Sequence, residues 1–453
     1  MDGQIHEECG VIGLFGVDGA ASLAALGLHA LQHRGQESAG IATVQAGKMH
    51  LVKGMGLVSA LFSKWETGQL PGDAAIGHVR YSTAGGSNFA NAQPLLGRYT
   101  GGEAAIAHNG NLVWAARLQR DLCSSGALFQ TTTDSEIFLH LLAREQAVDD
   151  EAIAGVFSLA GPAFSVVLLL ADRLIAARDP YGYRPLVLGR SGSGWAVASE
   201  TCAFDQIGAV YEREIEPGEM LVVSSAGCRS VDFAGTRPRS ARCLLELIYF
   251  ARPDSLVFGE TPHLFRQRCG RLLAAEQPAQ ADIVVPIPDS GMSAAMGYAD
   301  ALNIPWERGL IRNHYVGRSF ISPGQEARVA AVRMKNNVVS EVVRGRRVVL
   351  VDDSLIRGTT TQALGRVLRK AGAREVHMRI ACPPTRYPCS YGVDFPRHEE
   401  LLAHKFSLGQ IRERLNLDSL GYLSLQGMTG LFGEQSDTFC TSCWSGEYRV
   451  PPE

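Results

Sequence analysis

The sequence predicts two domains, the second of which has an α/β fold built on a parallel sheet. Strand and helix patterns alternate from residue 282 to residue 380, which is typical of a doubly wound parallel sheet. A length of 453 residues favours two or three domains. Between Ser224 and Ala241 the sequence becomes polar and basic and loses its periodicity. We therefore expect one domain over 9–235 and another over 236–453.

The composition limits the classes of protein to which the chain can belong. Apolar residues make up 46% of the chain, which is enough for large cores, and the formal charge of −3 leaves no basic field for nucleic acid. No apolar run approaches the ~20 residues of a membrane span, and the acidic N-terminus MDGQIHEECG has no apolar core of a signal peptide. We expect a soluble cytoplasmic protein that binds neither nucleic acid nor membrane. Its 10 cysteines then favour metal or catalytic roles over disulfides.

The first half begins with an apolar, glycine-rich strand that carries Cys9. An amphipathic helix over Leu23–Gln32 follows it. Polar loops punctuated by glycine come after apolar strands, and such loops are typical of an active-site rim. These loops are His33–Gly40, Gly77–Thr83, Asn91–Pro94 and His108–Leu112. By itself, Cys9 has the pattern of an ordinary buried strand cysteine.

Taken together, these segments resemble the class II glutamine amidotransferases, which are N-terminal-nucleophile hydrolases. The resemblance covers Cys9 to Gly227 and implies an α+β domain in the form of a four-layer αββα sandwich. In such an enzyme the thiol of the first residue uses its own α-amine as general base, and that amine has an ordinary pKa of about 7.7–8.0. Because eight residues precede Cys9, the resemblance implies that Met1–Glu8 is a propeptide that must be removed.

The resemblance also implies roles for the partners of Cys9. Arg80 pairs with the α-carboxylate of glutamine, for which a bidentate guanidinium is suited, and Asp134 holds the α-ammonium group. Arg34 is a further glutamine-binding residue. Asn109 and Gly110 form the oxyanion hole through a side-chain amide and a backbone N–H. Without the resemblance, these residues are typical of a surface arginine, a helix N-cap and an Asn-Gly turn.

The second half carries a phosphate-binding pattern after the apolar run Val348–Val351, which predicts a buried strand. Two acids follow at once, Asp352 and Asp353, and then a glycine and threonines, Gly358–Thr361, at the start of a helical pattern. Free N–H groups and the positive end of a helix favour an anion there. The two acids suit ribose hydroxyls or a hydrated Mg²⁺. No Gly-Lys-Ser/Thr follows the glycine, so the pattern is not a Walker A loop.

This stretch resembles the 5-phosphoribosyl 1-diphosphate (PRPP) loop of type I phosphoribosyltransferases. A second loop, Pro286–Gly291, follows the strand Ile283–Val285, and we expect both loops to face one pocket at the carboxyl ends of the strands. The resemblance implies that Ser290, Asp352 and Asp353 surround Mg²⁺. It implies PRPP binding by Asp352, Asp353, Ser354, Arg357, Gly358, Thr359 and Thr360.

A basic, irregular stretch runs from Arg312 to Lys335 and has few candidate core residues. Its composition alone is equally typical of a solvated surface loop. The resemblance to phosphoribosyltransferases implies a flap that closes over the diphosphate, in which Arg333 and Lys335 bind PRPP. Mobile covers of this kind exclude water from reactive intermediates.

Four cysteines have the spacing of a metal site. Cys440 and Cys443 form a CxxC pair, and Cys243 and Cys389 could complete four ligands. Zinc is the general interpretation, and a redox pair is disfavoured because no βαβ unit begins there. The spacing resembles the iron–sulfur branch of the glutamine PRPP amidotransferases, which implies a [4Fe–4S] cluster. Propeptides occur in the same branch, which agrees with the position of Cys9.

The resemblance to glutamine PRPP amidotransferases extends along nearly the whole chain. It implies conversion of glutamine, water and PRPP to 5-phosphoribosylamine, glutamate and diphosphate, the first committed step of purine synthesis. It also implies a homotetramer inhibited by purine nucleotides. Three alternatives remain: another class II amidotransferase, a PRPP-binding regulatory protein without amidotransferase activity, and a zinc-stabilised structural protein. The PRPP loop disfavours the first, Cys9 with Arg80 and Asp134 disfavours the second, and the third explains only the cysteines.

Overall fold

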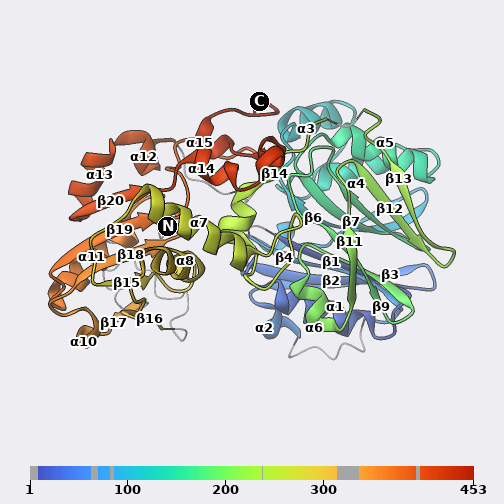
Figure 1. Ribbon diagram of the computed structural model, residues 1–453. Coiled ribbons are helices and arrows are strands. Elements are labelled where there is room, and N and C mark those ends of the chain that lie inside the picture. The colour runs from blue at the N-terminus through green and yellow to red at the C-terminus, as the bar shows by residue number, and fades with distance from the viewer. Residues whose placement is uncertain are drawn as a thin grey trace.

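Two domains lie side by side, the first on the right of Figure 1 in blue to green and the second on the left in yellow to red. The predicted propeptide Met1–Glu8 and the predicted flap residues Arg333 and Lys335 lie outside the described part of the chain. The computed structural model describes residues 9–62, 70–81, 86–236, 238–313, 336–393 and 398–452.

The first domain is built on two sheets whose described strand pairings are antiparallel. The first sheet has the order β11 (Val210–Glu214), β9 (Val187–Ser191), β10 (Gly194–Ala198), β1 (Gly10–Phe15), β4 (Ala74–Arg80), β2 (Ser38–Gln45) and β3 (Lys48–Met55). The second has the order β13 (Gly227–Asp232), β12 (Glu219–Ser224), β8 (Arg173–Arg178), β7 (Phe164–Leu169), β6 (Gly102–Gly110) and β5 (Leu95–Tyr99).

Side chains that alternate along these strands build separate core layers. On β1, Val11 belongs to the layer between the two sheets, whereas Ile12 and Leu14 pack into the layer under the first sheet's helices. On β7, Val167 faces the other sheet and Leu168 faces the helices of its own side. Because a strand presents successive side chains to opposite faces, a strand covered on both faces is apolar throughout.

Helices cover the outer face of each sheet, so the domain has the four-layer αββα order expected from the sequence. The first sheet is covered by α1 (Ala20–Ala30), α2 (Val58–Phe62) and α6 (Cys202–Ile207). The second is covered by α3 (Ala115–Ser124), α4 (Glu136–Leu142) and α5 (Asp150–Ala160).

The second domain contains the parallel sheet that the sequence predicts. Its order is β15 (Ile283–Pro286), β18 (Arg347–Asp352), β19 (Glu375–Ile380) and β20 (Ser419–Tyr422), and each described pairing is parallel. The centre of β18 is buried on both faces, which explains its continuous apolar sequence. The helices are α7 (Pro262–Glu276), α8 (Met292–Leu302), α10 (Ser340–Val343), α11 (Thr359–Lys370), α12 (Leu402–Lys405), α13 (Leu408–Leu415), α14 (Leu425–Gly430) and α15 (Ser442–Ser445).

Two short two-stranded sheets complete this domain. In one, β16 (Leu310–Arg312) pairs with β17 (Asn336–Val338). In the other, β14 (Arg242–Cys243), which follows the domain boundary, pairs in parallel with β21 (Phe439–Cys440) near the end of the chain. The C-terminal segment with α14 and α15, red in Figure 1, therefore lies across the top of the molecule next to the first domain.

The first domain includes part of the stretch in which the sequence loses its periodicity. The polar stretch Ser224–Ala241 contains β13, which pairs with β12 along its whole length, and Phe233 packs into the core of the first domain. As an edge strand with mostly exposed or half-buried residues, β13 lacks the apolar alternation that marks a strand in sequence. The first domain therefore extends through Phe233.

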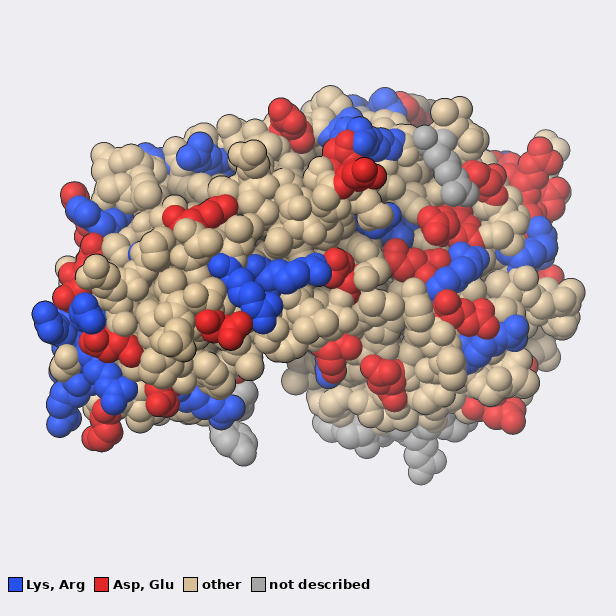
Figure 2. Space-filling model, viewed as in Figure 1, with Lys and Arg blue, Asp and Glu red and all other residues tan. Residues whose placement is uncertain are grey.

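The surface carries charges of both signs. On the face drawn in Figure 2, Lys and Arg side chains lie among Asp and Glu side chains over both domains. Within the described ranges, no helix combines the length and apolarity needed to cross a bilayer.

Candidate active sites

Cys9 immediately precedes β1, beside the end of β4. Gly10 pairs with Val79, and the Cys9 Sγ donates to the carbonyl oxygen of Tyr81 at 3.4 Å. The side chain is buried, and burial raises the pKa of the Cys9 thiol to about 11, although Arg80 opposes the shift. The thiol is therefore protonated at neutral pH, and a nucleophile at this position needs a general base.

Asn109 and Gly110 end strand β6, which faces β4 across the space between the two sheets. The ring Nε2 of His78 donates to the His108 carbonyl at 2.9 Å, and burial lowers the pKa of His78 to about 3, so the ring is neutral. The Asn109 side chain is fully buried, and neither its Nδ2 nor its Oδ1 has a hydrogen-bond partner among the described residues. An amide left unpaired in this way is rare in a folded protein and suggests a ligand.

Asp134 and Arg80 bring opposite charges to the same region. Asp134 is buried, its Oδ2 accepts from the Leu112 N–H at 2.7 Å, and its Oδ1 lies 3.7 Å from His108 Nδ1. Arg80 is buried at the end of β4 and donates to the Gly86 carbonyl at 3.3 Å. Arg80 lowers and Asp134 raises the pKa of Cys9, so both charges act on the thiol. A ligand with one carboxylate and one ammonium group matches this pair.

Arg34 lies beside Cys9, and its guanidinium binds two buried carboxylates. Its Nη1 donates to Glu200 Oε1 at 2.6 Å, and its Nη2 donates to Glu246 Oε1 at 2.7 Å. Its Nε donates to the Cys9 carbonyl at 3.0 Å. The guanidinium is fully buried, and these bonds direct its donors to protein groups. The motif match identified the residue but not the direction in which its side chain points.

The two predicted loops of the second domain lie together at the carboxyl ends of β15 and β18. Pro286 pairs with Val351, and the Ser290 hydroxyl donates to Asp352 Oδ1 at 3.1 Å. The Asp353 N–H donates to the same oxygen at 3.0 Å. Burial and the adjacent Asp353 carboxylate raise the pKa of Asp352 well above its usual range. A bound cation would relieve this repulsion.

The loop after these acids leads into helix α11 as predicted. Gly358 has φ 74, in the left-handed region that favours glycine, and Thr359 is the first helical residue. The hydroxyl of Ser354 donates to Asp353 Oδ1. Arg357 donates through Nε to Glu400 Oε2 at 2.9 Å. The side chain of Thr360 lies outside the described part of the structure.

The four predicted metal-binding cysteines line one small cavity. Strand pairing sets Cys243 directly opposite Cys440, and the cavity is also lined by Cys389, Cys443, Tyr183, Leu245, Tyr391 and Val393. Burial raises the pKa of Cys243 to about 12 and that of Cys440 to about 11, so thiolates here need a cation. In the described ranges, no three potential ligands converge on a position for one metal ion.

The loop that carries Cys389 also contacts the glutamine site. The Asn111 side-chain amide donates to the Ser390 carbonyl at 3.1 Å. A Cβ added to Gly392 would lie 3.0 Å from the carbonyl carbon of Gly110. The second domain therefore packs against the strand end that carries the predicted oxyanion hole.

Comparisons with known proteins agree with this two-part arrangement. A glutamine amidotransferase domain model matches residues 78–206, and a phosphoribosyl transferase domain model matches residues 263–390. The chain is 45% identical to the amidophosphoribosyltransferase of Bacillus subtilis over 98% of this chain and 94% of that protein. The chain belongs to the amidophosphoribosyltransferase family.

Two further comparisons cover nearly the whole length of this family member. A chloroplastic amidophosphoribosyltransferase of Arabidopsis thaliana is 47% identical over all of this chain and 81% of its own. The solved structure of the B. subtilis glutamine PRPP amidotransferase with ADP and GMP matches with a TM-score of 0.93 and 44% identity, over 98% of both chains. The chain is therefore an enzyme with a glutamine amidotransferase and a phosphoribosyltransferase half, and it acts at the first step of purine biosynthesis.

Two buried acids of this chain were missed as site residues. Glu200 and Glu246 both bind Arg34, from positions far along the chain. Glu246 is the single acid in the run LLELIYF, and an acid in so apolar a segment must find a cationic partner when it is buried. That signal was present in the sequence, although the identity of the partner was not.

Proposed function

We propose that Cys9, freed by removal of Met1–Glu8, is the nucleophile that releases ammonia from glutamine. Its sulfur attacks the side-chain carbonyl carbon of glutamine, and its α-amine takes the thiol proton and passes it to the departing ammonia. Water then hydrolyses the thioester to give glutamate. Asn109 is the observation that carries this proposal, because its buried amide has no partner among the described residues and suits an oxyanion. The N–H of Gly110 is the second donor.

Arg80 and Asp134 bind the two charged groups of the glutamine substrate. The guanidinium of Arg80 donates to the α-carboxylate, and the carboxylate of Asp134 accepts from the α-ammonium group. Their opposite effects on the pKa of Cys9 support this, because a substrate that neutralises both leaves the reacting carbonyl next to the thiol. Arg34 is not part of this recognition, since Glu200 and Glu246 hold its guanidinium.

The loops at β15 and β18 bind PRPP, the second substrate. Asp352 and Asp353 bind the ribose hydroxyls. The loop from Ser354 to Thr360 binds the 5-phosphate, next to the N-terminus of α11. Ammonia attacks C1 of PRPP, the bond from C1 to the diphosphate oxygen breaks, and loss of a proton from nitrogen gives 5-phosphoribosylamine. Arg333 and Lys335 remain candidates for binding the diphosphate.

Mg²⁺ fits beside the same acids. Ser290 and the two aspartates supply oxygen ligands, which this cation prefers, and its charge would stabilise the departing diphosphate. The elevated pKa of Asp352 supports a cation here, because two adjacent carboxylates repel each other without one.

The cavity of Cys243, Cys389, Cys440 and Cys443 holds a [4Fe–4S] cluster with a structural role. Four thiols around one cavity support a bound metal group, and their spacing, which resembles the iron–sulfur branch, supports a cluster over zinc. Protein purified without oxygen is expected to be brown and to contain four iron atoms per chain. A colourless, active protein with one zinc per chain would contradict the cluster.

The enzyme also forms a homotetramer that purine nucleotides inhibit. The related B. subtilis enzyme was solved with ADP and GMP, and 44% identity over 98% of both chains supports nucleotide binding by this chain. Light scattering gives the mass of the assembly, and inhibition by GMP and ADP at fixed PRPP tests the regulation.

The substitution Cys9→Ala tests the proposed function. We expect it to abolish product formation from glutamine, by roughly 10³-fold or more, because the nucleophile itself is lost. Product formation from PRPP and ammonium chloride should remain within twofold of the unaltered enzyme, which serves as the control for folding. Continued use of glutamine by the Cys9→Ala enzyme would refute the assignment. The mature protein should also begin at Cys9 by intact mass.

A further inference from the structure

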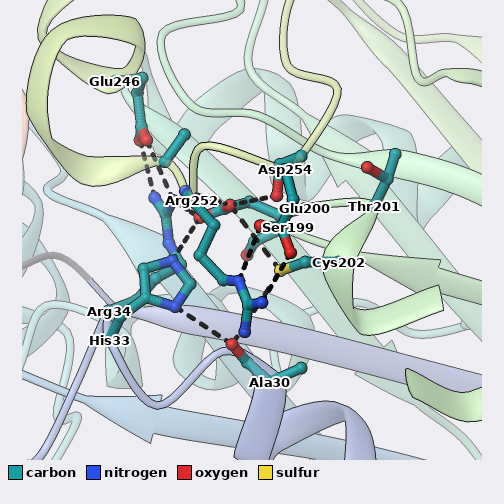
Figure 3. Close-up of polar contacts among 12 residues, drawn as sticks. Ala30, His33, Arg34, Ser199, Glu200, Thr201, Cys202, Glu246, Arg252 and Asp254 are labelled. Atoms are coloured by element: carbon teal, nitrogen blue, oxygen red, sulfur yellow. Dashed lines mark hydrogen bonds and ion pairs between the residues drawn. The ribbon is translucent and has the colours of Figure 1, made fainter. Parts of the chain in front are cut away.

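A buried cluster of charges joins the two domains behind Cys9. Arg34, Arg184 and Glu200 come from the first domain and Glu246 from the second, and all four side chains are 0% exposed. Figure 3 shows the guanidinium of Arg34 pointing toward both Glu200 and Glu246. Two cations and two anions balance one another, so the cluster is neutral only when both domains contribute to it.

The guanidinium of Arg34 links Glu246 of the second domain to the backbone of Cys9. Arg34 binds Glu246 as a fork, with Nη2 to Oε1 at 2.7 Å and Nη1 to Oε2 at 3.0 Å. Its remaining edge points the other way, and Nε donates to the Cys9 carbonyl at 3.0 Å. Because the guanidinium is planar and rigid, the fork to Glu246 also fixes the direction of Nε.

We propose that Glu246 is a positioning residue for the glutamine half of the reaction and that it acts through Arg34 on the carbonyl of Cys9. This inference rests on the proposed role of Cys9 as the nucleophile. The Cys9 carbonyl is one bond from the Cα that carries both the thiol and the α-amine. A shift of that carbonyl therefore displaces both the nucleophile and its base relative to Asn109.

The charges of the cluster explain why Glu246 matters to the direction of Arg34. Burial alone would lower the pKa of Arg34, but Glu246 and Glu200 outweigh it and hold that pKa above its usual range. The guanidinium thus stays charged when Glu246 is neutralised, and we expect it to turn toward Glu200. Nε then leaves the Cys9 carbonyl. A displacement of about 1 Å at a reacting group can reduce a rate by roughly 10²-fold.

The competing explanation is that Glu246 only docks one domain on the other. Other contacts across the same boundary provide a comparison, because they bind the second oxygen of Glu200 rather than Arg34 itself. The hydroxyl of Ser255, from the second domain, donates to Glu200 Oε2 at 2.7 Å, and the Arg252 N–H donates to the same oxygen at 2.9 Å. Loss of the Ser255 hydroxyl weakens docking and leaves the fork between Arg34 and Glu246 in place.

The test compares Glu246→Gln with the matched control Ser255→Ala in the full-length enzyme. We expect Glu246→Gln to lower kcat for glutamine hydrolysis by about 10- to 100-fold, with KM for glutamine within threefold, because binding by Arg80 and Asp134 is untouched. The rate at which iodoacetamide alkylates the Cys9 thiol should change in the same variant. It is measured by mass spectrometry of the peptide that contains Cys9. Product formation from ammonium should stay within twofold, and Ser255→Ala should leave all four quantities within twofold.

Equal losses with glutamine and with ammonium in Glu246→Gln, or equal effects of the two substitutions, would overturn the inference in favour of docking. If Glu246→Gln does not fold, Arg34→Lys provides the second test. It keeps the positive charge but offers one nitrogen, which cannot serve both Glu246 and the Cys9 carbonyl, so the same selective loss is expected. Failure of the proposed nucleophile is distinguishable, since glutamine use would then survive in Cys9→Ala.

Discussion

The glutamine site lies inside the first domain, whereas the phosphoribosyl site lies at the edge of a sheet in the second. Cys9, Arg80 and Asn109 are at most 7% exposed and lie between two sheets. Ser290 and Asp352 are only half-buried, in loops at the carboxyl ends of two strands. A buried site excludes water before the substrate arrives, while an edge site is completed by its substrate and cation. The activity of the glutamine site is therefore more sensitive to small changes of shape than that of the phosphoribosyl site.

A glycine in each site illustrates the difference. A Cβ on Gly110 would lie 2.1 Å from the Ala163 carbonyl oxygen, which is backbone and cannot move aside. A Cβ on Gly358 would instead meet the side-chain ends of Leu402 at 2.9 Å and Leu415 at 3.1 Å. The first site is fixed by backbone contacts, and the second by flexible side chains.

Asn109→Ala is the substitution with the largest expected effect. Loss of one donor to an oxyanion in a buried site should lower kcat for glutamine hydrolysis by about 10²–10³-fold. Synthesis from ammonium should be unchanged, which separates the two sites within one protein. A loss below tenfold would mean that Asn109 is not part of the oxyanion hole.

Asp353→Asn tests the other side of the comparison. We expect synthesis from both glutamine and ammonium to fall by about 10²-fold, because hydrogen bonds to a charged group are lost, while glutamine hydrolysis without PRPP is retained. Asp282→Asn, at the opposite end of β15 in an exposed pair with Arg347, is the matched control and should stay within twofold. Equal effects of the two substitutions would argue against a PRPP site at Asp353.

Gly358→Ala is expected to have the smallest effect. Its φ of 74 costs a residue with a Cβ about 1–2 kcal/mol, so KM for PRPP should rise by roughly tenfold. Gly409→Ala, in the exposed α13 with nothing within 4 Å of the added Cβ, serves as the control. A KM for PRPP unchanged in Gly358→Ala would mean that this loop does not hold the phosphate.

Most elements near the two sites could be predicted from the sequence because their signals are local. The run Val348–Val351, the two acids and the glycine before α11 lie within one short segment, and the structure forms β18, the loop and the helix there. Spacing and family resemblance predicted that the four cysteines lie together. In the structure, the pairing of β14 with β21 sets Cys243 opposite Cys440.

The sequence predicted the structure less well where the position of a residue depends on partners that are distant in the chain. Arg34 lies 166 positions from Glu200 and 212 from Glu246, so the direction of its side chain is decided by tertiary packing. Strand β13 lies in the stretch where the sequence shows no periodicity, because an exposed edge strand has no apolar face to reveal it. In both cases the sequence does not reveal which distant part of the chain packs against the residue or strand.

The contact of Gly392 with Gly110 bears on how freely such domains can be exchanged during evolution. Because the two backbones approach each other closely, beside the guanidinium of Arg184, the fit depends largely on the path of each chain. A glutaminase unit transplanted onto another synthase would meet a loop of different course, and no single compensating substitution would restore the match. The loop that carries Cys389 and the strand β6 that ends at Gly110 are thus expected to be inherited together, as one unit of selection that crosses the domain boundary.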